Sequence, residues 1–311
     1  MMTGSRSLGV LALIATAVLW GSNHVVARAV RETVPLQALV FWRWFSALAV
    51  LTLIAWPALQ RNWPEIRPRL RELTIGGVFG VGLFSYLLLG GAYQSLAIEV
   101  GFINATTPVW VILLSWLMGG EQVTNSAKAG LALAFAGTLL IICKGDPARL
   151  TGLQLNLGNL WSLLAAIVFA WFSIRIREWS QTIETLPLAV VTAWAGLIIV
   201  LLPVYLVSVT SGGPWLAWHD ADIYVALGAL AYMGFGPTML GNVFYLYGVR
   251  TNGAARAAGF LYLSPLCTAL FSVVWLGEQP AWYHAAGFVA IFAGLLLSGR
   301  PRRTPEAPKV V

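Results

Sequence analysis

Residues 91–140 read GAYQSLAIEVGFINATTPVWVILLSWLMGGEQVTNSAKAGLALAFAGTLL, and residues 248–297 read GVRTNGAARAAGFLYLSPLCTALFSVVWLGEQPAWYHAAGFVAIFAGLLL. At a constant offset of 157 residues, without a gap, the two stretches are identical at 15 of 50 positions. The matching positions include Pro108 with Pro265, and Gly120-Glu121-Gln122 with Gly277-Glu278-Gln279. The sequence therefore predicts two copies of one structural unit.

The composition places both copies in a lipid bilayer. Hydrophobic residues make up 59% of the chain, charged residues make up 10%, and the mean hydropathy is +0.77. Apolar runs of about 20 residues, long enough to cross a bilayer as a helix, follow one another along the chain. We expect ten spans, at about 8–30, 36–58, 73–97, 101–119, 127–144, 156–176, 187–209, 221–248, 253–275 and 281–299. The expected fold is an all-α integral membrane bundle with five helices in each half.

The distribution of Lys and Arg orients these helices. Ten crossings place four cations on one side of the membrane, Arg28, Arg31, Lys144 and Arg149, and Arg43 falls inside the second span. The other side receives 14 cations: Arg6, Arg61, Arg67, Arg69, Arg71, Lys128, Arg175, Arg177, Arg250, Arg256, Arg300, Arg302, Arg303 and Lys309. Because the cytoplasmic side carries the excess of positive charge, we expect both termini in the cytoplasm. The net charge of +7 is then topological and does not indicate a nucleic-acid partner.

An odd number of helices in each copy makes the second copy enter the membrane from the opposite side. Inverted repeats of this kind are typical of transporters, in which the substrate binds near the midplane between the repeats. We expect a first repeat over residues 1–150, a second over 151–299, and a basic cytoplasmic tail over 300–311. The first apolar run could be a cleavable signal peptide, but a retained helix is favoured because its removal would leave unequal halves.

The first span carries an unusual polar stripe. Trp20, Asn23, His24 and Ala27 are spaced so that they share one face of a helix. Polar groups in a membrane span face protein or water and not lipid. Two interpretations remain open: Asn23 and His24 hydrogen-bond to a neighbouring helix, or they contact a substrate directly.

Arg43 lies roughly 10 Å from the outer end of the second span, at about 1.5 Å per helical residue. One interpretation is that its long side chain extends to the membrane interface, beside Trp42 and Trp44 in an interfacial aromatic belt. The other is that its guanidinium binds a substrate carboxylate.

The fourth span supplies the strongest candidate site. Asn104, Thr107 and Trp110 bring hydrogen-bonding groups into an apolar run, where lipid would not tolerate them. Pro108 either bends the helix or frees a backbone carbonyl as an acceptor. Because Pro265 repeats it, a structural role as a kink or hinge is the more economical explanation.

Other aromatic and polar residues are candidates for a central cavity. A third proline, Pro237, interrupts a glycine-rich run in the eighth span and is a further candidate hinge. Trp20, Trp110 and Trp171 lie deeper than the other tryptophans and either line the cavity or pack between helices. The remaining candidates are Tyr86, Tyr93, Asn242, Tyr245 and Tyr262.

Catalytic and metal-binding patterns are missing from the sequence. The three histidines, His24, His219 and His284, lie on separate elements, away from any cysteine or aspartate at metal-ligand spacing. Cys143 and Cys267 both lie in apolar spans, which argues against a disulfide framework. A carboxylate proton relay at the membrane centre is unsupported, because no Asp or Glu is placed in the middle of a span. We therefore expect no enzymatic activity, cofactor or metal. Three modes of transport remain open: facilitated transport, exchange, or coupling through His24.

The chain resembles the EamA repeat of the drug/metabolite transporter superfamily. The resemblance rests on the two five-helix halves, on Leu19-Trp20-Gly21, and on the spacing Pro108 to Glu121 and Pro265 to Glu278. Within the superfamily, residues 98–104, Ile-Glu-Val-Gly-Phe-Ile-Asn, followed by Pro108, are similar to the helix three–four junction of bacterial aromatic amino-acid exporters. Residues 105–107, Ala-Thr-Thr, depart from the bulkier aromatic residues of the enteric exporters.

This resemblance implies a basket-like bundle with a central cavity in a bacterial inner membrane. It implies an exporter of amino acids, aromatic ones included and with broad specificity, that works by alternating access; the departure at residues 105–107 favours a wider cavity. An exporter of drugs or other small metabolites is the alternative. The expected partners are the small-molecule substrate and the lipid bilayer, without nucleic acid, and the expected state is a monomer.

Overall fold

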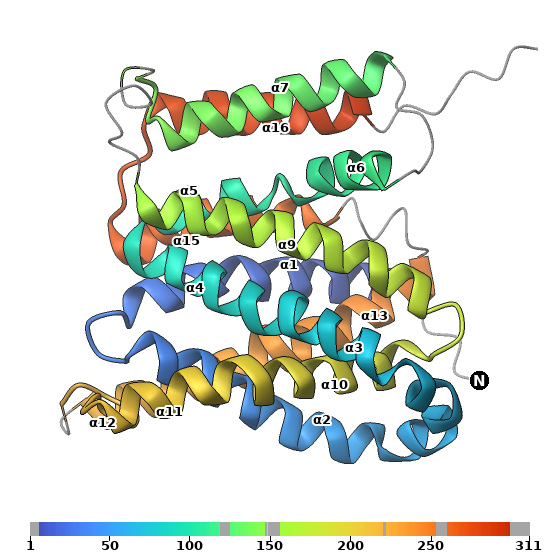
Figure 1. Ribbon diagram of the computed structural model, residues 1–311. Helices are drawn as coiled ribbons and strands as arrows, with labels where there is room; N and C mark the ends of the chain where they lie inside the picture. Colours follow the sequence, from blue (N-terminus) through green and yellow to red (C-terminus); the bar gives the residue numbers. More distant parts are fainter. Residues whose placement is uncertain are drawn as a thin grey trace, which may run out of the picture.

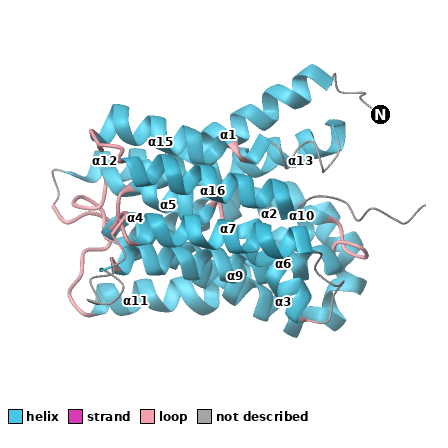
Figure 2. Cartoon of the chain, turned by 90° about the horizontal axis from the view of Figure 1, so that it is seen from above, coloured by secondary structure: helices cyan, strands magenta, loops and turns pink. Residues whose placement is uncertain are grey.

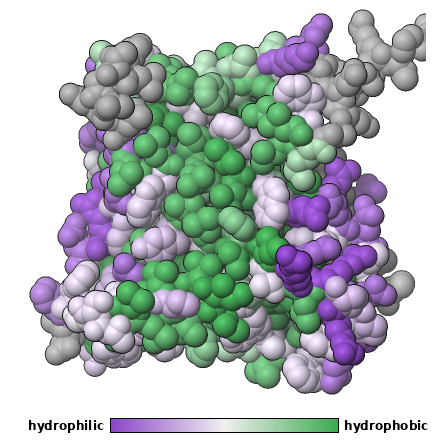
Figure 3. Space-filling model, in the orientation of Figure 1, coloured by the Kyte–Doolittle hydropathy of each residue, from purple (hydrophilic) through white to green (hydrophobic). Residues whose placement is uncertain are grey.

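The computed structural model describes residues 6–118, 125–146, 148, 156–219, 222–252 and 260–298. Within these ranges all regular secondary structure is helical (Figure 2). The surface in Figure 3 has a wide hydrophobic region between two hydrophilic edges, and the helices of Figure 1 run from one edge towards the other. The arrangement is that of a helical bundle whose lipid-facing band lies between two polar ends.

The first half contains nine helical segments in its described residues. They are α1 (Arg6–Ala29), α2 (Leu36–Ile66), η1 (Arg67–Arg69), α3 (Leu70–Gly77), η2 (Val78–Leu83), α4 (Phe84–Gln94), α5 (Ala97–Asn104), α6 (Thr107–Leu117) and α7 (Asn125–Ile142). The second half contains α9 (Leu157–Trp179), α10 (Thr185–Gly196), η3 (Leu197–Leu201), α11 (Leu202–Thr210), α12 (Ile223–Met233), η5 (Gly234–Leu240), α13 (Gly241–Asn252), α15 (Leu263–Leu276) and α16 (Trp282–Ser298). The segments η2, η3 and η5 are π-helical.

Six helical stretches in the described residues are long and apolar enough to cross a membrane. They are Arg6–Ala29, Leu36–Gln94, Ala97–Leu117, Leu157–Trp179, Thr185–Thr210 and Ile223–Val249. Three further helices are also apolar but shorter: Lys128–Ile142, Leu263–Leu276 and Trp282–Leu297. The stretch Leu36–Gln94 has 59 residues and covers two of the expected spans.

The expected basic loop over residues 60–72 is instead helical. Helix α2 continues to Ile66, and η1 joins it to α3, where the chain doubles back (Figure 1). Pro57 and Pro64 lie inside α2 and Pro68 lies in η1, so the reversal takes place without a long loop. At this end, Arg61 pairs with Glu184 at 3.4 Å and Asn62 donates to Glu184 at 2.9 Å. The hydrogen bond from Asn62, followed by the charge of Arg61, lowers the pKa of the Glu184 carboxyl.

The expected fourth span is broken. Helix α5 ends at Asn104 and α6 begins at Thr107, with Ala105 and Thr106 in a turn between them. Pro108 is the second residue of α6, and Pro265 lies in the first turn of α15. A proline in a first helical turn costs no hydrogen bond, since those N–H groups have no partner inside the helix. Both prolines therefore start a helix after an interruption and do not kink a continuous one.

The final helices of the two copies, α7 and α16, lie side by side at one face of the bundle (Figure 1). A methyl group on Gly137 would lie 2.7 Å from the carbonyl oxygen of Gly287, and one on Gly287 would lie 2.8 Å from that of Gly137. A methyl group on Gly294 would lie 2.4 Å from the carbonyl oxygen of Gly130. These glycines let the two backbones approach as closely as in small-residue membrane helix pairs.

The first helix of each copy packs against the third helix of the other. Gly9 and Leu13 of α1 contact the end of α13, where Leu13 fits against Gly248. In the same way, Gly158 and Ser162 of α9, the first helix of the second copy, contact the end of α4 in the first copy. There Ser162 lies against Gly91. Gly91 and Gly248 are the first residues of the two repeated stretches, so the same contact occurs twice.

Helix α1 packs against helices of both halves. It contacts α13, α15, α4, α5 and α12, so it has neighbours from both halves (Figure 1). A large apolar core joins residues of α1 to α4 with residues of α9 to α12. A smaller one joins α5, α6, α7 and α16, where Phe102 and Ile141 are buried. The polar stripe of α1 is thereby carried into the protein interior.

The close contact between α3 and α10 generates a prediction about stability. A methyl group on Gly77 would lie 2.0 Å from the backbone oxygen of Thr192. We expect Gly77→Ala to destabilise the purified protein by about 1–3 kcal/mol, because the backbones must separate. The measurement is the thermal unfolding midpoint in detergent.

The matched control for this prediction is Gly228→Ala in α12, since nothing lies within 4 Å of the added methyl group. Its midpoint should stay the same or rise slightly, because alanine favours a helix more than glycine does. Equal midpoints for the two variants would show that α3 and α10 do not meet as closely as described.

Candidate functional site

A buried hydrogen bond joins the first two helices. Arg43 of α2 donates from Nη1 to Oδ1 of Asn23 of α1 over 2.8 Å. Arg43 is only 5% exposed and Asn23 is 7% exposed. The interpretation that Arg43 extends to the membrane interface is therefore wrong: α2 faces α1 at this position, so the guanidinium lies inside the protein.

The two tryptophans beside Arg43 also point into the bundle. Trp42 donates to the hydroxyl of Tyr205 at 3.3 Å, and Trp44 donates to that of Ser85 at 2.8 Å. The guanidinium carbon of Arg43 lies 5.6 Å from the centre of the Trp44 ring. Both indoles therefore have protein partners, and the expectation that Trp42 and Trp44 lie in an interfacial belt stays a prediction.

Two polar atoms of this cluster lack hydrogen-bond partners among the described residues. They are Nδ1 of His24, which is 5% exposed, and Nε of Arg43. Buried polar groups nearly always have a partner, and leaving one without costs about 1–3 kcal/mol. An acceptor supplied by a ligand would satisfy the free Nε of Arg43, so the cluster can bind an anionic group.

Trp20 connects the α1 stripe to the π-helical segment η5. Its indole donates to the carbonyl oxygen of Pro237 at 3.1 Å, and its ring lies 5.4 Å from that of Tyr245. Pro237 has no N–H for the Met233 carbonyl, and the hydroxyl of Thr238 donates to that carbonyl at 2.7 Å instead. The irregular backbone of η5 is thus held by side chains on both of its sides.

Two neighbours of this region have different surroundings. Asn242 donates to the carbonyl oxygen of Thr238 at 2.7 Å, and Asn242 itself lies on the exposed surface of the protein. Ser22 and Tyr232 share a hydrogen bond of 2.6 Å between α1 and α12. Neither Ser22 nor Tyr232 was singled out as a site residue from the sequence, although Ser22 directly precedes Asn23.

The break between α5 and α6 forms a second polar region. Thr107 donates to the carbonyl oxygen of Asn104 at 2.7 Å, and the Trp110 indole donates to the hydroxyl of Thr106 at 3.1 Å. Oδ1 of the half-buried Asn104 has no hydrogen-bond partner among the described residues. The hydroxyl groups of Thr106 and Thr107 therefore donate to backbone carbonyl groups of the turn. The side-chain oxygen of Asn104 remains an acceptor without a donor in the part of the chain that the structure describes.

Thr268 of α15 links the two polar regions. Its hydroxyl donates to the carbonyl oxygen of Gly21 at 2.8 Å, directly beside the α1 stripe. A methyl group on Gly101 of α5 would lie 2.9 Å from the methyl carbon of Thr268. Gly101 is three residues before Asn104, so Thr268 holds α1 and α5 together near both sets of polar groups.

Four expected site residues pack elsewhere. Tyr93 donates to the carbonyl oxygen of Val34 between α1 and α2, and the Tyr86 ring lies 6.1 Å from that of Trp161. Trp171 packs edge-on against Phe79, and Tyr262 against Phe292. Each has protein neighbours on another element, and the structure does not bring these four together with the α1 stripe.

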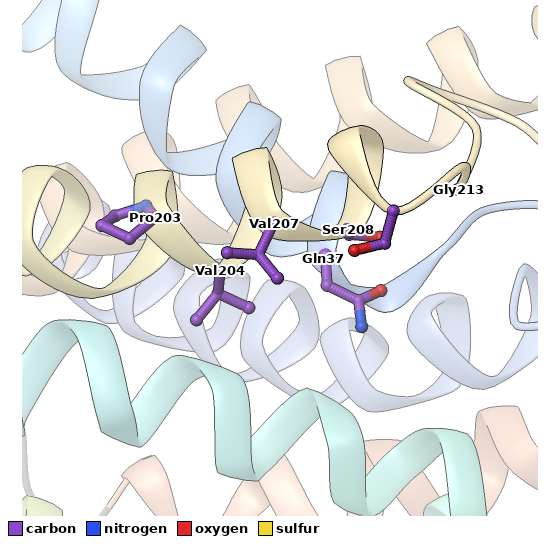
Figure 4. Close-up of a pocket in the computed structure, with 7 residues that line it drawn as sticks. Gln37, Pro203, Val204, Val207, Ser208 and Gly213 are labelled. Carbon is purple, nitrogen blue, oxygen red and sulfur yellow. The ribbon is translucent and has the colours of Figure 1, made fainter.

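The two pockets described do not coincide with either polar region. One, of about 530 Å³, lies between α11 and the start of α2 and is lined by Gln37, Val204, Val207 and Ser208 (Figure 4). The other, of about 190 Å³, is lined by Trp171, Trp179, Glu72 and Arg175 at the end that carries η1. The described residues hold no group of three His, Cys, Asp or Glu side chains suited to a metal ion.

Comparison with known proteins agrees with this architecture. A profile of the EamA-like transporter family matches residues 7–143 and again residues 156–300. A probable terminal-alkyne amino-acid exporter of Streptantibioticus cattleyicolor is 29% identical over 94% of each chain. A probable amino-acid metabolite efflux pump of Escherichia coli (strain K12) is 25% identical, over 98% of this chain and 99% of its own.

Further relatives extend the same pattern. An uncharacterized transporter of Bacillus subtilis, YetK, is 23% identical over 96% of this chain and 88% of its own. A solved crystal structure superposes with a TM-score of 0.58 at 18% identity, covering 95% of this chain and 97% of that one, which shows the shared fold. The protein is a multi-pass transporter of a bacterial membrane and not an enzyme. The family match spans nearly the whole described chain, and the chain belongs to the EamA-like transporter family.

Proposed function

We propose that the protein exports amino acids, aromatic ones included, across the bacterial inner membrane by alternating access. The observation that carries this proposal is the buried Arg43–Asn23 pair beside His24, at the centre of a transporter bundle. A charged arginine in a span is costly, and such residues commonly mark a substrate or ion pathway. Relatives named as amino-acid exporters support the same substrate class.

A free amino acid offers three groups for recognition. Its carboxylate suits the fork of nitrogen donors on Arg43, where Nε is without a partner. Its ammonium group suits a neutral acceptor, and Oδ1 of Asn104 is free for that role. Its side chain would lie against Trp20 and Tyr245, whose rings already stack at an angle of 42°.

We further propose that the two halves, residues 1–150 and 151–299, are inverted repeats, with 300–311 as a cytoplasmic tail. Gly130 and Gly137 correspond to Gly287 and Gly294 at the offset of 157 residues. The contacts join Gly137 to Gly287 and Gly130 to Gly294, as expected when equivalent helices meet antiparallel about a two-fold axis. The reciprocal contacts of α1 with α13 and of α9 with α4 support the same symmetry.

Charge placement supports the orientation. Two of the cations expected on the cytoplasmic side lie at the end that carries η1, where Arg61 contacts Glu184 and Arg69 contacts Thr182. Arg28 and Lys144 from the cation-poor set lie near carboxylates of other helix ends, Glu278 and Glu99. We propose that the first end is cytoplasmic, that the second is external, and that the protein acts as a monomer.

Arg43→Met tests the carboxylate interaction. Flux of radiolabelled phenylalanine into proteoliposomes should fall by roughly 10- to 100-fold at low substrate, the loss expected for one charge-assisted hydrogen bond of about 1.5–3 kcal/mol. Flux of phenethylamine, which lacks the carboxylate, should change by less than about threefold if the guanidinium reads only that group. An equal loss for both compounds would mean that Arg43 supports packing and not recognition.

The control for this variant is Arg61→Met, which removes an exposed arginine that pairs with Glu184 at the end of the bundle. It should transport phenylalanine at the wild-type rate, because exposed ion pairs contribute little. If wild-type protein carries none of Phe, Trp, Thr, Met, Lys and Glu, the substrate class is wrong, and drugs or other small metabolites become the candidates.

Asn104→Ala tests the second polar region. We expect flux to drop by about 5- to 15-fold, since one neutral hydrogen bond of about 1–1.5 kcal/mol is lost in the bound state. Folded yield and the unfolding midpoint should be unchanged, because Oδ1 of Asn104 has no hydrogen-bond partner in the protein among the described residues. Wild-type transport in this variant would remove Asn104 from the site.

A further inference from the structure

One end of the bundle holds a cluster of ionisable side chains that the proposed substrate site does not use. They come from the ends of different helices. Arg28 lies in the last turn of α1, Glu99 in the first turn of α5, Lys144 just after α7, Glu278 between α15 and α16, and His284 in the first turn of α16. The cluster therefore joins the helix ends that must separate if this end of the bundle opens.

Glu278 is fully partnered. One of its carboxylate oxygens accepts the backbone N–H of Ala97 at 2.8 Å, and the other accepts that of Ile98 at 3.1 Å. The Arg28 Nε lies 3.0 Å from the same carboxylate. Glu278 thus satisfies the N-terminal backbone of α5 and neutralises Arg28, a structural role that requires its negative charge.

Glu99 is only partly satisfied, although none of its surface is exposed. Oε2 accepts the Asn159 side chain of α9 at 2.8 Å. Oε1 makes no hydrogen bond within the described residues, and its nearest cationic neighbour is Nζ of Lys144 at 3.4 Å. The Nε2 of His284 lies 3.8 Å from Oε1, beyond hydrogen-bond distance.

The tautomer of His284 follows from its other nitrogen. Nδ1 accepts the backbone N–H of Ala281 at 2.9 Å, so it carries no proton of its own. A neutral ring must then hold its proton on Nε2, which faces Oε1 of Glu99. The rings of Phe102 and Tyr283 lie beside the imidazole, at 6.5 and 4.3 Å between ring centres. Protonation of His284 would break its bond with Ala281.

The charges of the closed cluster balance only while Glu99 is ionised. With His284 neutral, the carboxylates Glu99 and Glu278 face the cations Lys144 and Arg28. Only the carboxylate of this ion pair is fully buried, since the Lys144 side chain is 28% exposed and that of Glu99 is 0% exposed. A proton added to Oε1 of Glu99 would remove the attraction that draws the Lys144 ammonium group to α5, and the group could then turn fully into water.

We propose that Glu99 is a proton-binding site, and that proton uptake on its carboxylate opens this end of the bundle. The inference rests on the proposed function, since an exporter must open this end to release its cargo. In the proposed orientation the end faces outside the cell, so external protons favour the release state. The proton comes from solvent, the Glu99 carboxylate becomes a neutral acid, and the Lys144 ammonium group moves into water.

Cys143 provides a reporter inside the protein. Cys143 directly precedes Lys144 in the chain. It is 4% exposed in the structure, in which the end of the bundle that holds the ion cluster is closed. In a Cys267→Ser background, the reaction of Cys143 with a membrane-impermeant maleimide measures opening without any substrate. Each rate is divided by that of glutathione at the same pH, because thiolate chemistry itself depends on pH.

The decisive comparison is between the wild-type carboxylate and Glu99→Gln, which mimics the protonated acid. At about pH 8 the variant should label at least about tenfold faster than the parent, a coupling of ordinary size for a conformational switch. The ratio should fall towards one only as the pH drops to about 4 and below, because a solvated glutamate takes up its proton at about pH 4.3. A ratio that does not change with pH, or a Cys143 that stays protected in Glu99→Gln, would overturn the proposal.

Two controls keep the test decisive. Glu184→Gln removes an exposed carboxylate at the opposite end and should label like the parent at every pH. If Glu99→Gln yields no folded protein, the glutathione-normalised rate of the parent alone must rise by about threefold or more between about pH 8 and about pH 4, with the rise confined to pH values below about 5, and a flat profile contradicts the proposal. Labelling that depends on pH in a protein without amino-acid flux would refute the transport proposal and leave this site in place.

Discussion

The structure depends on the exchange of first helices between the two copies. Helix α1 packs on α13 and α15 of the second half, while α9 packs on α4, α5 and α6 of the first. Glycines at the crossings, Gly91 and Gly248 among them, allow this approach because any side chain there would overlap the opposite helix. In a bilayer no hydrophobic force drives such helices together, so close packing and hydrogen bonds must hold them. The halves therefore interlock, and α1 lies between them.

The position of α1 explains why its polar residues are buried in protein and do not face lipid. Asn23 and His24 can be polar because both are buried in protein, where Asn23 accepts a hydrogen bond from Arg43 of α2. The irregular segments η2, η3 and η5 occur beside glycine or proline, where neighbouring helices and side chains take over the hydrogen-bonding groups. The Thr238 hydroxyl at the Met233 carbonyl is one such replacement. A bundle of ideal helices would have no such adaptable segment next to its buried arginine.

The sequence was sufficient to predict the repeat, the all-helical membrane fold and the family, since each depends on composition or on spacing along one chain. It also identified Asn23, His24 and Arg43, because polar residues inside apolar runs need no partner to be recognised. It could not reveal that Arg43 bonds to Asn23, since this requires the packing of α2 on α1. For the same reason the sequence could not show the partners of Trp42 and Trp44, since Tyr205 and Ser85 lie far away along the chain.

Local patterns also misled where two rules competed. Charged residues with Pro64 and Pro68 suggested a loop over residues 60–72, yet the chain stays helical there because an exposed helix tolerates charge and a proline can begin a new turn. Glu99 lies between two expected spans, and the sequence did not show that it is fully buried. The role of Glu278 was also out of reach, because its carboxylate accepts from the backbone of Ala97 and Ile98, which lie far away along the chain.

The ion cluster and the candidate substrate site share helix α1, which connects them mechanically. His24 and Arg28 are four residues apart and so lie on the same face of α1. Arg28 is fixed through Glu278 to the start of α5, and Thr268 fixes Gly21 of α1 to α15 one turn below His24. A helix of 24 residues moves as a rigid element over such distances. A change that frees Glu278 or Glu99 at the end of the bundle therefore also shifts the surroundings of Asn23 and Arg43, and the geometry couples opening to substrate binding without any further part.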